Sequence, residues 1–156
     1  MLPGGSMQRK EQGFTLIELM ITIAIFTIIS MMAAPSFGDM MLSQNLNKST
    51  QNLILTLNEA RSKAALERRS IRVDLLPNES IPMPTNTPVL VNWRPTGKAI
   101  LKSGSPVSIT FDITGAVSGA NTDTTFQICN KSGGVKSKII SISKMGTIQQ
   151  TTEGTC

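Results

Sequence analysis

The chain has 156 residues, of which 40% are hydrophobic and 16% are charged, so it can bury one core of ordinary size and is not disordered by composition. It contains no histidine and no tyrosine, which excludes a histidine-based catalytic triad, an imidazole metal site and a tyrosine acid. The net charge of +5 permits anionic partners without requiring them. No nucleophile, base and orienting group stand at a recognisable spacing, so we expect no enzyme activity, metal or cofactor.

An apolar segment follows a short basic stretch near the amino terminus. From Leu19 to Gly38 no residue carries an ionisable side chain, and a helix of that length covers about 30 Å, the hydrocarbon core of one bilayer. Arg9 and Lys10 precede the segment and should hold that end in the cytoplasm while the rest is exported. We expect one membrane span. Translation can begin at Met1 or Met7, and both starts keep the basic stretch.

Two simpler interpretations of this segment compete. A secretory signal peptide has an apolar region of about 7 to 15 residues that ends at a small-x-small site, whereas this run is longer and its Ala33-Ala34 pair is followed at once by Pro35. An ordinary membrane anchor leaves Glu18 unexplained. A carboxylate there costs on the order of 2 to 3 kcal/mol unless it is paired or close to the interface, and placement at the interface is the alternative that stays open.

The residues around Glu18 resemble a known signal. Gly13-Phe14-Thr15-Leu16-Ile17-Glu18, preceded by a basic leader, is similar to the class III signal of type IV pilins and type II secretion pseudopilins. The resemblance implies that prepilin peptidase cuts between Gly13 and Phe14 and methylates the new amino terminus of Phe14. Cutting there creates an ammonium group at the membrane edge, which Glu18 of a neighbouring subunit can neutralise as helices pack. Glu18 would then set the register of assembly.

The helix should continue past the membrane to about Arg69. At 100° per residue the apolar residues of this part fall within one narrow arc, and polar residues lie outside it. The arc contains Leu42, Leu46, Leu53, Leu57, Ala60 and Ala64, and outside it lie Gln44, Asn45, Lys48 and Glu59. Pro35, with Gly38 close behind, removes a backbone hydrogen bond and should kink or loosen the helix. Pilins commonly carry a proline in this region, so this feature extends the resemblance.

After Arg69 the pattern changes to short alternating strands, which we expect at residues 70–75, 89–93, 99–101, 108–112, 124–129 and 138–143. Four prolines from Pro77 to Pro88 predict an exposed loop between the first two strands. The expected fold class is α+β, with a long amino-terminal helix packed on an antiparallel β-sheet head.

The head resembles the GspH/FimT branch of the pilin superfamily. The similarity lies in the helix segment 57–64, the Trp93 strand leading to Gly97, residues 109–115 and residues 140–146. The cysteine at the apparent end of the chain suits the FimU-like minor pilins of that branch. With the signal, the resemblance implies a leader over residues 1–13, a transmembrane assembly helix over 14–38 and a head outside the cytoplasm over 39–156, which includes the second half of the long helix.

Cys129 and Cys156 lie in the part expected outside the cytoplasm, where disulfides persist. We predict that they pair, with two free thiols as the alternative. The bond would stabilise the head by about 3 to 4 kcal/mol in the chain-entropy model.

The basic residues of the head raise the question of DNA. FimT-like minor pilins are associated with DNA uptake through a Gly-Arg-x-Arg motif, and the matching residues here, Gly146-Thr147-Ile148-Gln149, lack both arginines. Two groups of basic residues could still contact the phosphates of DNA without recognising its base sequence. They are Lys131, Lys136, Lys138 and Lys144, and Arg61, Arg68, Arg69 and Arg72. A solvated charged face is the default, so a nucleic-acid partner is not favoured.

The resemblance implies a non-catalytic minor pilin of a type IV pilus that primes assembly or links the tip complex to the pilus. Its implied location is the inner membrane with the head in the periplasm before assembly, and the surface pilus afterwards. The implied partners are other minor and major pilins, prepilin peptidase and the inner membrane. The alternatives are a type II secretion pseudopilin of the GspH kind and a FimT-like DNA-binding minor pilin in DNA uptake.

Overall fold

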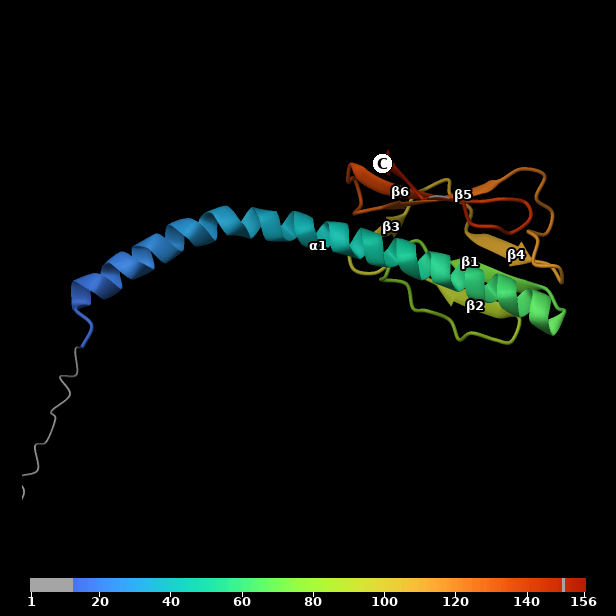
Figure 1. The fold of residues 1–156 in the computed structure, drawn as a ribbon, viewed down its shortest axis with the longest axis horizontal. Coiled ribbons are helices and arrows are strands. Elements are labelled where there is room, and N and C mark those ends of the chain that lie inside the picture. Colours follow the sequence, from blue (N-terminus) through green and yellow to red (C-terminus); the bar gives the residue numbers. More distant parts are fainter. Residues whose placement is uncertain (1–12, 150) are drawn as a thin grey trace, which may run out of the picture. The chain divides into compact units, whose positions relative to one another are not determined.

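The computed structural model describes residues 13–149 and 151–156, and in these residues one long helix precedes seven short strands (Figure 1). The helix is α1 (Leu16–Glu67). The strands are β1 (Ile71–Leu75), β2 (Leu90–Trp93), β3 (Ile100–Leu101), β4 (Ser108–Phe111), β5 (Thr124–Cys129), β6 (Lys136–Ile142) and β7 (Thr152–Thr155). The chain divides into two compact units, residues 1–38 and 39–156, each described by itself below.

The amino-terminal unit contains the apolar part of α1. Within the described residues, α1 is the one helix long and apolar enough, by length and composition, to cross a membrane. The large apolar side chains of this part of α1 are exposed, as at Leu16, Phe26 and Phe37. The chain stays helical through Pro35, so the proline does not end the helix, and the kink expected there stays a prediction.

The part of α1 in the second unit packs through the stripe that its sequence predicts. Five of the six expected residues are buried, namely Leu46, Leu53, Leu57, Ala60 and Ala64, and Leu42 is half-buried. Two polar residues, Ser49 and Thr50, are buried beside the stripe. Their hydroxyls donate to the carbonyls of Asn45 at 2.7 Å and Leu46 at 2.8 Å, which removes the cost of burying them unpaired.

The strands form two sheets where a single antiparallel sheet is expected from the sequence. One sheet has the order β2-β1-β4 and the other the order β3-β5-β6-β7. All pairs are antiparallel except β1 with β2, which run parallel with Leu75 opposite Trp93. Parallel neighbours need a connection of about a dozen residues or more, and the proline-containing loop over 76–89 supplies it. The expected α+β architecture is otherwise confirmed.

The strand β7 is absent from the sequence-based expectation. It pairs with β6, with Thr152 opposite Ile139 and Thr155 opposite Lys136, and it is largely exposed. A polar edge strand has no apolar face to bury, so it carries no alternating pattern. The strand β6 also begins two residues earlier than expected, at Lys136.

One hydrophobic cluster joins α1 to both sheets. Phe111 of β4 and Phe126 of β5 are its largest fully buried side chains. They come from different sheets and belong to the same core. Trp93 of β2 is also buried, at 3% exposure. The head is therefore a single body packed around one core.

Candidate assembly site and head surface

The segment expected to be processed lies just before α1. Gly13 and Phe14 are in irregular backbone, no atom lies within 4 Å of a β-carbon built on Gly13, and the Phe14 side chain is 81% exposed. Exposed irregular segments of this kind are the usual substrates of peptidases. Arg9 and Lys10 of the expected leader lie outside the described residues.

Thr15 and Glu18 form half of a capping box at the first turn of α1. The Glu18 N–H donates to Oγ1 of Thr15 at 3.3 Å, as expected for a threonine at the N-cap and a glutamate three residues later. The return bond is missing, because no residue in the described part of the chain donates to the Glu18 carboxylate within hydrogen-bonding distance. The Glu18 side chain is exposed, so its negative charge is available to a cation from another molecule.

The apolar part of α1 also contains hydroxyl groups, and three of them are satisfied inside the helix. Oγ1 of Thr22 donates to the Leu19 carbonyl at 2.8 Å, Oγ of Ser30 donates to the Phe26 carbonyl at 2.7 Å, and Oγ1 of Thr27 donates to the Ile23 carbonyl. Such back-bonding lets these three hydroxyls be buried in lipid or against a neighbouring helix without an unpaired donor. The segment can therefore enter either environment.

Cys129 and Cys156 form a disulfide, as the sequence predicts. Their Cα atoms are 5.9 Å apart, and the Cys156 N–H donates to the Val135 carbonyl at 3.3 Å. The bond fastens the residue after β7 to the end of β5. It therefore holds an exposed edge strand against the sheet.

Three of the four arginines near the end of α1, Arg61, Arg69 and Arg72, are engaged within the head. Nε of Arg61 donates to the Gly115 carbonyl at 3.2 Å and Nη2 to the Met145 carbonyl at 3.4 Å. Arg69 pairs with Glu67, and Arg72 pairs with Asp74. The first of these is a structural tie between α1 and two turns, so Arg61 is not a free phosphate contact.

Asp112 organises the turn after β4. Its Oδ1 accepts hydrogen bonds from Oγ1 of Thr114 at 2.6 Å, from the Thr114 N–H at 2.8 Å and from the Ala116 N–H at 3.2 Å. The hydrogen bond from the Thr114 hydroxyl, followed by those from backbone N–H groups, lowers the pKa of Asp112 below its usual value of 3.8. The Asp112 carboxylate therefore stabilises the turn in which it lies.

Over the residues that the structure describes, no three His, Cys, Asp or Glu side chains come together as metal ligands.

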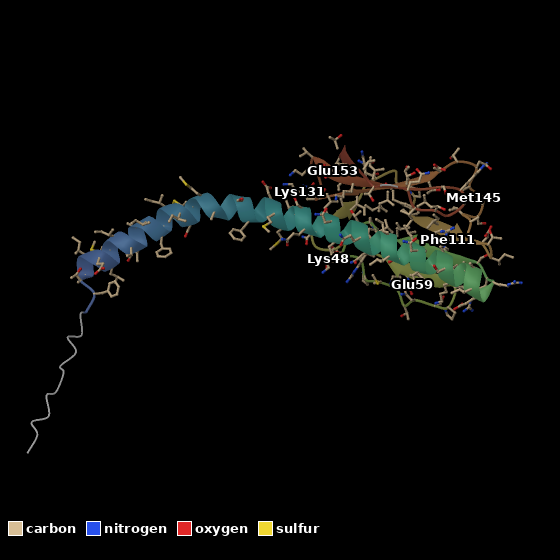
Figure 2. All side chains as sticks on the ribbon, in the orientation of Figure 1. Lys48, Glu59, Phe111, Lys131, Met145 and Glu153 are labelled. Carbon is tan, nitrogen blue, oxygen red and sulfur yellow. A yellow bond between two sulfur atoms is a disulfide. The ribbon has the colours of Figure 1, made fainter. Side chains whose placement is uncertain are left out.

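The four lysines considered for phosphate contact do not form one patch. Lys131 and Lys136 line a cavity with Ser43, whereas the Lys144 carbonyl accepts from Val117 in the turn that Arg61 holds. Ser43 and Arg61 are about 27 Å apart along α1. Figure 2 places Lys131 and Met145 at opposite ends of the head. Lys144 is thus remote from the others, which removes support for a single DNA-binding surface.

Comparisons with known proteins agree with these features. A family model described as the prokaryotic N-terminal methylation motif matches residues 8–34, and one described as type II transport protein GspH matches residues 49–146. The type IV minor pilin FimU of Pseudomonas aeruginosa is similar in structure, with 23% sequence identity, 69% of this chain and 88% of that chain covered, and a TM-score of 0.46. No curated protein matches the chain.

Proposed function

The chain belongs to the GspH family, and from this premise we propose that it is a minor pilin of a type IV pilus that primes assembly or links the tip complex to the fibre. Members of this family are non-catalytic structural proteins of type IV pili and type II secretion systems. One observation carries the proposal. A prepilin motif leads into an exposed apolar helix whose first turn holds an unpaired glutamate, Glu18, in the same chain as a GspH head.

The proposed assembly step uses this motif. Prepilin peptidase cuts between Gly13 and Phe14, and the amine released on Phe14 is methylated. A methylated amine remains a cation, and its burial among apolar helices is costly unless an anion accompanies it. Glu18 of the adjacent subunit supplies the anion, while the exposed apolar side chains of α1 are buried by neighbouring helices. The ion pair then selects the register in which these helices pack.

The choice of the pilus rests on the head. The head resembles FimU-like minor pilins in having Cys156, and this cysteine forms a disulfide with Cys129. The alternative is a pseudopilin of a type II secretion system, and the description of the family as type II transport protein GspH favours it. Both candidates need the same processing and the same membrane helix, so the site at Gly13, Phe14 and Glu18 does not separate them.

A deletion strain separates the two candidates. If the chain is a minor pilin, mass spectrometry of sheared surface filaments will detect it in low abundance, and the deletion will reduce piliation and twitching while protein secretion stays intact. Complementation with the wild-type chain is the control. Loss of secretion with normal piliation would instead assign the chain to the secretion system.

A further inference from the structure

The turn between β5 and β6, taken here as residues 131–136 so that it includes the first residue of β6, carries two lysines on either side of an apolar side chain. Lys131 and Lys136 are exposed, and Val135 between them is 73% exposed. The Gly134 N–H closes the turn by donating to the Lys131 carbonyl at 3.1 Å. The surface of this turn therefore combines an apolar side chain, Val135, with the positive charges of Lys131 and Lys136.

This turn lies against the first residues of the head helix. It shares a cavity of about 270 Å³ with Asp39, Leu42 and Ser43. An adjoining cavity of about 230 Å³ brings Lys136 and Lys138 beside Ser43. Asp39 follows directly on Gly38, where the apolar run ends. When that run spans a bilayer, Asp39 is at the membrane surface, and the 131–136 turn is within reach of the lipid headgroups.

The surroundings of the turn carry more positive than negative side chains. In the part of the chain that the structure describes, the ion pairs are those of Arg69 with Glu67 and Arg72 with Asp74, so Lys131 and Lys136 have no carboxylate partner at that distance. Asp39 is the one acidic residue lining the larger cavity. The two cavities together are lined by three lysines, Lys131, Lys136 and Lys138, and by two carboxylates, Asp39 and Glu153. The site is therefore net positive, which suits a singly charged phosphodiester.

We propose that the 131–136 turn binds the phosphate of an anionic phospholipid headgroup and holds the head at the membrane before assembly. Lys131 and Lys136 contact the phosphate, and Val135 enters the boundary between headgroups and acyl chains. Membrane phosphate is favoured over nucleic acid for two reasons. Asp39, which lines the site, directly follows the apolar run in the sequence. An exposed valine also gains burial in lipid that duplex phosphates do not provide.

Lysine footprinting of the full chain tests the proposal. The chain is reconstituted into nanodiscs of phosphatidylcholine alone or with phosphatidylglycerol, acetylated briefly and analysed by mass spectrometry. We expect Lys131 and Lys136 to react about fivefold more slowly in the discs with phosphatidylglycerol, as a lysine at an anionic surface does. Lys144, at the other end of the head, is the internal control and should react equally in both. Added salt should weaken the protection.

Variants of the full chain provide an independent measurement. Native mass spectrometry after mild detergent extraction should find less phosphatidylglycerol on the Lys131→Gln/Lys136→Gln variant than on the wild type or on Lys144→Gln. Val135→Asp should also reduce the amount of phosphatidylglycerol retained.

Equal reactivity of Lys131 and Lys136 in the two kinds of nanodisc would overturn the proposal. Equal protection by inorganic phosphate in phosphatidylcholine discs would assign the site to free phosphate, and protection by duplex DNA alone would assign it to nucleic acid. Each of these results leaves the filament experiment above unaffected.

Discussion

The guanidinium of Arg61 donates from Nε to the carbonyl oxygen of Gly115 at 3.2 Å, which ties the head helix to the turn after β4. Replacement by alanine also removes the bond to the Met145 carbonyl. A hydrogen bond that involves a charged group contributes about 1.5 to 3 kcal/mol. We expect Arg61→Ala to lower the free energy of unfolding of the detergent-solubilised protein by about 2 kcal/mol.

Trp93 reports this unfolding, because it is the chain's one tryptophan and is buried. Denaturant titrations followed by its fluorescence give the free energy directly. Lys63→Ala on the same helix is the matched control, since Lys63 forms no side-chain hydrogen bond with any described residue. Equal stability of the two variants would contradict the structural role of Arg61.

Gly146 allows two turns to approach each other. A β-carbon on Gly146 would stand 2.0 Å from the Gly115 carbonyl oxygen, and its φ is +78°. Gly104 has a φ of +90° but open space around it. Gly104→Ala should therefore cost only the strain of a left-handed residue, about 1 to 2 kcal/mol. Gly146→Ala adds a clash with backbone and should cost on the order of 3 to 4 kcal/mol. The same titration compares them, and equal costs would show that the close approach is not maintained in solution.

The disulfide between Cys129 and Cys156 closes a loop of sequence separation 27. In the chain-entropy model its loss costs about 3 to 4 kcal/mol. We expect Cys129→Ser/Cys156→Ser to lower stability by that amount and to speed hydrogen exchange in β7 more than in β1. Alkylation of the unreduced wild-type protein should modify neither cysteine. Two alkylated cysteines in protein from the oxidising compartment would contradict the pairing.

Asp112 makes part of the stability depend on pH. Its pKa is lowered in the folded state by the Thr114 hydroxyl and by backbone N–H groups. A carboxylate with a depressed folded pKa contributes stability above its unfolded pKa of about 3.8, and that contribution disappears as pH falls through the lower folded value. Asp112→Asn cannot ionise. The wild type should exceed it in stability at pH 7, and the difference should shrink between pH 5 and pH 2 in urea titrations. A constant difference would exclude the role of the charge.

The sequence predicts the parts of the fold that have a regular apolar pattern. The buried stripe of α1 and the strands that line the core follow from periods of 3.6 and 2, and the two cysteines follow from the expected compartment. The strand β7 could not be found in this way, because its residues are polar and its pairing depends on β6 and the nearby disulfide.

The contacts between residues that are far apart in the sequence could not be predicted from it either. Arg61 was one of several arginines in a basic group, and only folding brings the turns at Gly115 and Met145 to it. The parallel pairing of β1 with β2 depends on the path of the 76–89 loop, which sets where β2 begins. Likewise, the lysines at 131 and 136 separate from Lys144 only once the strands are folded. Glu18 is the opposite case, because its motif is contiguous in the sequence.

Glu18→Gln tests the assembly role of that motif. Glutamine keeps the size of the side chain and the helix but removes the charge that would accompany the amine of Phe14. An unpaired charge among apolar helices costs on the order of 2 to 3 kcal/mol, so incorporation into filaments should fall by about tenfold or more. Cleavage after Gly13 should continue, because Gly13 and Phe14 are unchanged, and Edman sequencing of the membrane fraction checks it. Glu59→Gln, at an exposed position of the same helix, is the control. Normal incorporation of Glu18→Gln, quantified in sheared filaments, would mean that apolar packing alone sets the register and that the Glu18 charge has no part in it.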